Sequence, residues 1–110
     1  MEPLYGVLEM LVLRTLVFGP LHGYGIAGAI KGSSGDALQI EFGSLYPALK
    51  RLELKGWIAS RWEVSERNRR AKFYRLTPAG RKRLRDEKTE WANFVSAVAL
   101  IMKPTAGEAD

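Results

Sequence analysis

The residues best suited to chemistry form a basic cluster in the second half of the chain. Arg67, Arg69, Arg70 and Lys72 place four positive charges within six positions. Charges of one sign repel one another at this spacing, and the phosphates of a nucleic acid would neutralise them while releasing counterions. The stretch 43–85 carries thirteen Lys and Arg residues against three Asp and Glu, whereas the whole chain has a net charge of +5. A solvated basic surface is the alternative, but the arginines converge on one expected turn, which favours a polyanionic partner.

Groups suited to catalysis or to metal binding are scarce. His22 is the only histidine of the sequence, and there is no cysteine. A single histidine cannot form a metal cluster, and no pair of carboxylates at helical spacing accompanies it. We interpret His22 as a structural residue at the start of a helix. The sequence therefore predicts no enzyme activity, no metal site and no cofactor.

Three glycines imitate a nucleotide-binding motif. Gly23, Gly25 and Gly28 have the spacing G-x-G-x-x-G, and Glu41 follows near the offset of the acid in a dinucleotide site. That site requires a strand, a tight turn and a helix within a βαβ unit. Here Pro20 separates the glycines from the preceding apolar run, and no further strand and helix pairs follow. We therefore reject this interpretation, and a thermal-shift test with NAD would exclude it.

The stretch from Leu4 to Phe18 is almost continuously apolar and predicts the first helix. Glu9 and Arg14 interrupt it, and Gly19-Pro20 ends it before the ~20 residues that a membrane span needs. A helix that is apolar on more than one face needs a second burial site, which a partner subunit would supply. Because the chain start also lacks a basic signal region, we expect a cytoplasmic protein with no membrane partner.

A second helix is predicted over 22–30, followed by a loop over 32–36 and by a short strand or extended chain over 38–41. The third helix begins near Gly43, and Gly56 ends it. Leu45, Leu49 and Leu52 share one face of this helix at i, i+4 and i+7.

Two runs of β-forming residues follow, over 57–64 and 72–76, with a polar turn over 65–70 in which Asn68 can adopt positive φ. A helix followed by a hairpin with a basic tip is the outline of a winged helix. The helix would enter the major groove and the hairpin would lie along the phosphates. The expected fold class is mainly α with a small β-hairpin.

The longest predicted helix starts with Thr77 as its cap and Pro78 at its first position, and it runs to about Met102. Its apolar residues recur every seven positions, which is typical of a helix that pairs across a dimer. We expect a winged helix-turn-helix domain over 1–77, a dimerisation helix over 78–104 and a flexible tail over 105–110. The predicted dimer interface consists of Leu4, Leu8, Leu11, Leu84, Trp91, Phe94, Val95, Val98, Ile101 and Met102.

Several motifs together resemble the PadR family of bacterial transcriptional regulators, in particular its short subfamily first named from acidobacteria. They are HGYG at 22–25, GSLYPAL at 43–49, RLE at 51–53, GWI at 56–58, and NRRAKFYRLT at 68–77 with AGR at 79–81. The resemblance implies a homodimeric winged helix-turn-helix repressor on a pseudo-palindromic operator, with a single C-terminal dimerisation helix. It implies that Tyr24, Ser44, Tyr46 and Lys50 face double-stranded DNA. With the exposed face of the third helix and the basic cluster, the predicted DNA-binding residues are Tyr24, Ser44, Tyr46, Pro47, Lys50, Arg51, Arg67, Arg69, Arg70 and Lys72.

Two questions stay open at this point. Trp91 sits where some small members of this family take flat aromatic compounds between tryptophans, which implies an effector pocket for a small planar aromatic ligand. Packing of the indole in the dimer seam is the alternative, and the apolar sequence around it favours packing. A winged-helix protein-interaction module without DNA binding is the alternative function, which the basic charge disfavours.

Overall fold

The computed structural model describes the backbone of residues 3–105 and 107, and the side chains from residue 6 onward within that part. Residues 1–2 and most of the predicted tail over 105–110 lie outside the described residues, as does the side chain of Leu4. The elements are α1 (Pro3–Thr15), the 3-10 helix η1 (Leu16–Phe18), β1 (Leu21–His22), α2 (Gly23–Ser33), α3 (Phe42–Leu54), β2 (Ile58–Val64), β3 (Arg70–Leu76) and α4 (Pro78–Met102). This is the winged helix fold that the sequence predicts, mainly helical with a small antiparallel sheet.

The sheet consists of the predicted hairpin and one short strand that the sequence does not reveal. Strands β2 and β3 pair from Ile58 with Leu76 to Val64 with Arg70. Strand β1 adds Leu21 against Tyr74 on the other side of β3, giving the order β1-β3-β2. A two-residue strand is too short to show an alternating pattern, so only its pairing partner defines it. Residues 38–41 form no strand, so the first of the two predicted alternatives for this stretch is wrong.

A single apolar core holds the helices against the sheet. The predicted inner face of α3 is confirmed, because Leu45, Leu49 and Leu52 are all buried. Burial of each such side chain stabilises the fold by roughly 1.5–3 kcal/mol. The other core residues come from every remaining element except β1: Val12, Leu13, Leu16, Ile26, Ile30, Ile58, Tyr74 and Leu84.

The start of α4 is fixed against the hairpin. Thr77 is the predicted cap, and its Oγ1 accepts a hydrogen bond from the Gly80 amide at 3.0 Å. The same hydroxyl donates to the Gly56 carbonyl oxygen at 2.7 Å. A Cβ on Gly80 would lie 1.9 Å from the carbonyl oxygen of Trp57, so only glycine allows this close contact. The direction of α4 is thus set by its first turn.

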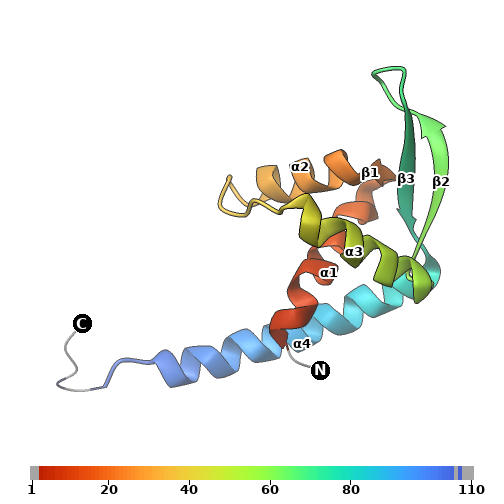
Figure 1. Ribbon diagram of the computed structural model, residues 1–110. Coiled ribbons are helices and arrows are strands. Elements are labelled where there is room, and N and C mark those ends of the chain that lie inside the picture. The colour runs from red at the N-terminus through yellow and green to blue at the C-terminus, as the bar shows by residue number, and fades with distance from the viewer. Residues whose placement is uncertain (1–2, 106, 108–110) are drawn as a thin grey trace.

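From that turn α4 runs under α1 and continues past the rest of the domain (Figure 1). The molecule is correspondingly elongated, with extents of 61 × 28 × 23 Å. The hairpin of β2 and β3 projects on the other side, beyond α2 and α3 (Figure 1). Within the described part of the chain, no helix is both long enough and apolar enough to cross a membrane.

Candidate nucleic-acid interface

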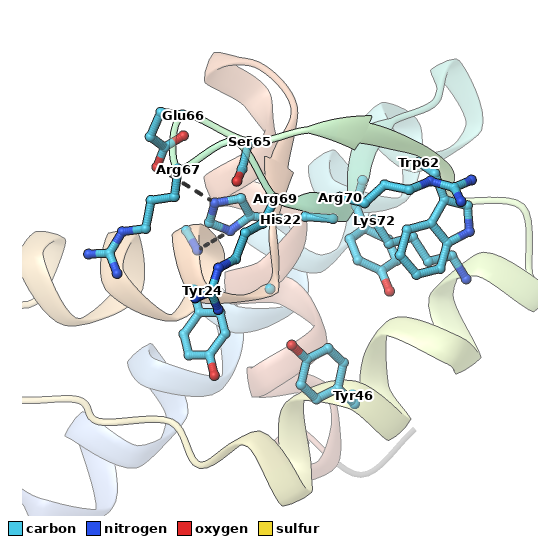
Figure 2. A pocket seen from close by; sticks show the side chains of 14 residues that line it. His22, Tyr24, Tyr46, Trp62, Ser65, Glu66, Arg67, Arg69, Arg70 and Lys72 are labelled. Atoms are coloured by element: carbon cyan, nitrogen blue, oxygen red, sulfur yellow. Dashed lines mark hydrogen bonds and ion pairs between the residues drawn. The ribbon is translucent and has the colours of Figure 1, made fainter.

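A cleft of about 920 Å³ lies between the N-terminus of α2, the exposed side of α3 and the hairpin. Side chains from the hairpin form one wall, while Tyr24 of α2 and Tyr46 of α3 lie on the helical side (Figure 2). The cleft brings together six of the ten predicted DNA-binding residues although they are up to 48 positions apart in the sequence: Tyr24, Tyr46, Arg67, Arg69, Arg70 and Lys72.

The tip of the hairpin has the predicted geometry. Asn68 adopts a φ of 57°, and its amide donates to the Ser65 carbonyl oxygen at 2.9 Å. The Ser65 amide in turn donates to the Arg69 carbonyl oxygen at 2.7 Å, which closes the turn. The side chains of Arg67, Arg69 and Arg70 are all exposed around this turn. Their guanidinium groups are therefore available to a ligand in the cleft.

Trp62 is a cleft residue that the sequence reasoning missed. It lies on β2 opposite Lys72 and is 58% exposed. The Arg70 guanidinium lies over its indole, 5.4 Å from the ring centroid, which is a cation–π geometry. A bulky exposed aromatic residue on a strand next to a basic turn is the signal that could have identified it. The stacking holds Arg70 along the wall of the cleft.

Two of the predicted DNA-binding cations are already paired inside the chain. Lys72 Nζ lies 3.5 Å from the Glu53 carboxylate, and Arg51 Nε lies 2.8 Å from the Glu9 carboxylate. Glu53 also accepts a hydrogen bond from the Ser60 hydroxyl. The structure thus places Arg51 at the contact between α1 and α3, outside the cleft, and it places Lys72 at the joint between α3 and the hairpin. The remaining predicted residues Ser44, Pro47 and Lys50 are exposed on α3 beside the cleft.

His22 has the structural role that the sequence predicts. It is the cap of α2, and its Nδ1 accepts a hydrogen bond from the Gly25 amide at 3.0 Å. Its Nε2 lies 3.9 Å from the Glu66 carboxylate at the hairpin tip (Figure 2). The ring also meets Phe73 edge to face, with centroids 5.1 Å apart. One imidazole therefore joins the start of α2 to strand β3 and to the tip of the hairpin.

An aromatic row crosses from α2 to α3 at the edge of the cleft. Phe42 lies between Tyr24, whose ring meets it edge to face at 4.7 Å, and Tyr46, whose ring stacks at 5.8 Å. A Cβ on Gly23 would lie 2.6 Å from the Tyr46 hydroxyl, so glycine at this position lets Tyr46 reach across to α2. Burial raises the pKa of the neighbouring Tyr74 hydroxyl, and the Glu53 carboxylate raises it further.

The predicted dimer residues fall into several environments. Leu84 is only 5% exposed and belongs to the core of its own chain, so it has little surface left for a partner. Leu8, Leu11 and Phe94 are partly buried. Those with substantial exposed surface are Trp91, Val95, Val98, Ile101 and Met102, to which the structure adds Leu100.

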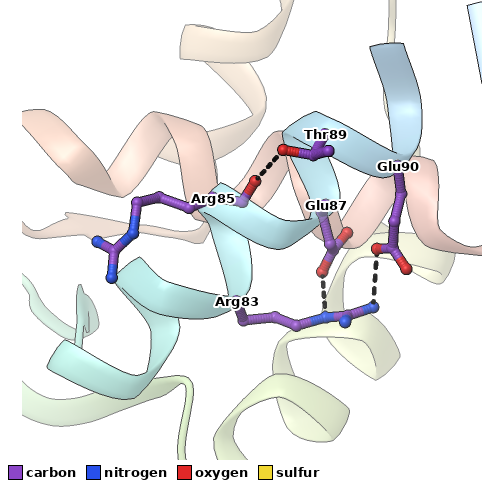
Figure 3. A network of polar contacts seen from close by, with 5 residues as sticks. All are labelled: Arg83, Arg85, Glu87, Thr89 and Glu90. Carbon is purple, nitrogen blue, oxygen red and sulfur yellow. Dashed lines mark hydrogen bonds and ion pairs between the residues drawn. The ribbon is translucent and has the colours of Figure 1, made fainter. Parts of the chain in front are cut away.

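A hollow of about 280 Å³ lies between α1 and α4 and includes Trp91 and Glu87 in its lining. Glu87 is 4% exposed, and its carboxylate accepts a hydrogen bond from Arg83 Nε at 3.0 Å (Figure 3). Another nitrogen of Arg83 lies 3.7 Å from the Glu90 carboxylate. Burial raises the pKa of Glu87 above its ordinary value of 4.5, although the Arg83 guanidinium opposes this shift. Among the described residues, no three His, Cys, Asp or Glu side chains lie together as metal ligands would.

The comparisons with known proteins agree with this architecture. Residues 12–86 match the family described as "Transcriptional regulator PadR-like family". The "Negative transcriptional regulator PadR" of Bacillus subtilis is 32% identical over 80 residues, covering 73% of this chain and 44% of that protein. A protein of Streptomyces fradiae from transposon TN4556 is 44% identical over 90 residues, which are 82% of this chain but only 24% of the relative. A transcriptional regulator from Clostridium thermocellum has a TM-score of 0.83 at 28% identity, covering 94% of this chain and 100% of its own.

Proposed function

The chain belongs to the PadR-like family of transcriptional regulators, and on that premise we propose that it binds double-stranded DNA as a homodimer and represses transcription from a pseudo-palindromic operator. The cleft is the observation that carries this proposal. It is lined on one side by the helices and on the other by three arginines of the hairpin, each exposed to solvent. The printed name of the Bacillus subtilis relative, a negative regulator, supports the direction of regulation.

The roles of the two elements differ in this proposal. Lys50 and Ser44 project from the exposed face of α3, where their polar groups can reach base edges in the major groove. Arg67, Arg69 and Arg70 surround a turn and contact phosphates, which fixes the position of the protein without reading sequence. Lys72 and Arg51 contribute less to DNA affinity, because each already neutralises a carboxylate of its own chain.

The exposed apolar surface of α4 supports the homodimer. Leu100, Ile101 and Met102 are each more than 70% exposed, an arrangement that costs free energy unless a second apolar surface covers it. In a dimer with a two-fold axis, these residues of one copy would pack against the equivalent residues of the second copy. Two recognition helices in such a dimer lie about one DNA turn apart, on the order of 34 Å. The planar aromatic effector stays a prediction for the hollow beside Trp91, with packing of the indole as the favoured alternative.

Selection of bound fragments from random double-stranded DNA tests the DNA-binding proposal. We expect enrichment of a pseudo-palindrome, and a reporter gene placed behind that fragment should be expressed less when the protein is present. Failure to enrich any duplex would favour the protein-interaction module instead. The variant Arg69→Gln should bind the selected fragment more weakly. Arg75→Gln is the matched control, since Arg75 is an exposed arginine of β3 that does not line the cleft.

Assembly is tested separately by sedimentation of the wild type and of Ile101→Lys. We expect a dimer at micromolar concentration for the wild type and a monomer for the variant, because the lysine would bring a charge into the apolar contact. Leu54→Lys is the control, since Leu54 is 79% exposed at the end of α3 and is not one of the predicted dimer residues. A wild type that sediments only as a monomer would contradict the homodimer.

A further inference from the structure

The aromatic row of Tyr24, Phe42 and Tyr46 contains one residue that the proposed function does not yet use. Phe42 is the first residue of α3 and is 37% exposed, while the two tyrosines beside it are more exposed still. Both tyrosines line the cleft, so Phe42 lies at its edge. The ring therefore lies beside the surface that a ligand of the basic hairpin would cover.

The position of Phe42 within α3 favours contact with bases. In helix-turn-helix proteins the N-terminal residues of the recognition helix meet base edges in the major groove. Gly43 and Ser44 follow Phe42 directly, and a Cβ on Gly43 would meet no atom within 4 Å. The backbone at Gly43 is thus open to an approaching base pair, and the Phe42 side chain keeps 37% of its surface exposed between the two tyrosines.

The chemistry of the ring restricts what it can read. A phenyl group has no hydrogen-bond donor or acceptor, so it cannot recognise the polar edges of guanine, cytosine or adenine. The apolar feature of the major groove is the 5-methyl group of thymine. The tyrosines hold the ring from two sides, edge to face at 4.7 Å and stacked at 5.8 Å. A ring that is already oriented loses less conformational freedom on binding than a free one.

We propose that Phe42 is a specificity-determining residue that contacts thymine methyl groups in the major groove, with Tyr24 and Tyr46 as the residues that position its ring. The inference rests on the proposed DNA-binding function. It predicts that the preferred half-site contains thymine opposite the N-terminal turn of α3. Polar residues of the same helix would read the neighbouring positions.

The test removes the methyl groups without changing base pairing. A fragment selected by the wild-type protein is synthesised twice, once with thymidine and once with deoxyuridine at every thymidine position. We expect the wild type to bind the deoxyuridine duplex about fourfold more weakly for each thymine methyl that the ring contacts. Phe42→Ser should bind both duplexes with affinities that agree within about twofold. Tyr46→Phe, which keeps the stacked ring, should show the wild-type ratio between the two duplexes, whatever its affinity for each of them.

The outcomes separate this inference from the function on which it rests. If no duplex is enriched, the proposed function fails and the inference falls with it. If a duplex is enriched but the wild type binds both forms equally, DNA binding stands and the thymine contact is wrong. The thymine contact is also wrong if Phe42→Ser keeps the wild-type ratio, because another residue then senses the methyl groups. Phe42→Leu provides a second folded variant, which should retain part of the ratio through its apolar side chain.

Discussion

The charge change Arg69→Gln should alter the salt dependence of DNA binding by an amount that follows from the structure. Arg69 is exposed, lines the cleft, and has no acidic partner within ion-pair distance among the described residues. If each of the three tip arginines neutralises one phosphate, a homodimer neutralises six. The logarithm of the binding constant then falls with the logarithm of salt concentration with a slope of about −5.

The substitution removes one phosphate contact from each subunit, so the slope should become less steep by about 1.8. Between 50 and 200 mM salt this difference changes the ratio of wild-type to variant affinity by about twelvefold. Fluorescence anisotropy of a labelled duplex at four or five salt concentrations measures the slope directly. The substitution leaves the turn intact, because the backbone carbonyl of Arg69 makes the closing hydrogen bond.

Arg51→Gln is the informative comparison for this measurement. Arg51 carries the same charge and is also partly exposed, but its guanidinium is held by Glu9 at 2.8 Å. We expect its salt slope to stay within experimental error of the wild type. Equal slopes for wild type and Arg69→Gln would refute the reasoning, since the hairpin would then make no phosphate contact. A flatter slope for Arg51→Gln would show that the ion pair with Glu9 opens on DNA.

Three further predictions concern the packing of the chain. Gly80→Ala should lower the melting temperature, because the new Cβ would lie 1.9 Å from the backbone oxygen of Trp57. The expected loss in the free energy of unfolding is about 1–3 kcal/mol or more. Gly28→Ala is the control and should be neutral or stabilising, since its Cβ would meet no atom within 4 Å. Glu87 has a raised pKa in the folded state, so the stability that its protonated form contributes is fully present below pH 4.5 and is lost as the pH rises through the raised value. Urea unfolding at several pH values should therefore show a smaller loss over this window for Glu87→Gln, and an unchanged pH profile would contradict the raised pKa. Titration with planar aromatic compounds should leave the fluorescence of Trp91 without saturable quenching if the indole packs in the seam, whereas quenching that is absent in Trp91→Phe would establish an effector site.

Features with a local sequence signal could be predicted. The buried face of α3 follows from the spacing of three leucines, and the start of α4 follows from Thr77 and Pro78. The positive φ of Asn68 follows from the tolerance of asparagine for that conformation and from its place in a polar turn. In each case the residues that cause the structure are neighbours in the chain, so the pattern is visible before any tertiary contact forms.

Features that depend on distant partners could not be predicted. Nothing in the sequence around Arg51 shows that Glu9, 42 positions earlier, will pair with it. The strand β1 exists only because Leu21 and His22 meet β3, at Tyr74 and Phe73. Leu84 fits the heptad pattern of a dimer helix, but the structure buries it in the core of its own chain. The tertiary arrangement, and not the local pattern, decides these environments.

The same distinction explains why the charge of the sequence overstates the DNA-binding surface. Of the predicted cations, Arg51 and Lys72 hold α3 against α1 and against the hairpin through Glu9 and Glu53. The Lys72–Glu53 pair joins α3 to the hairpin, so in the proposed complex it would act on affinity by positioning the tip arginines rather than by meeting a phosphate. Loss of Glu53 would therefore have two opposing effects, since it frees the charge of Lys72 and loosens the joint that aims the tip. A cation of this chain can contribute to DNA binding according to its position and its partner: of the thirteen basic residues of the central stretch, four line the cleft, and one of these, Lys72, is already paired with Glu53.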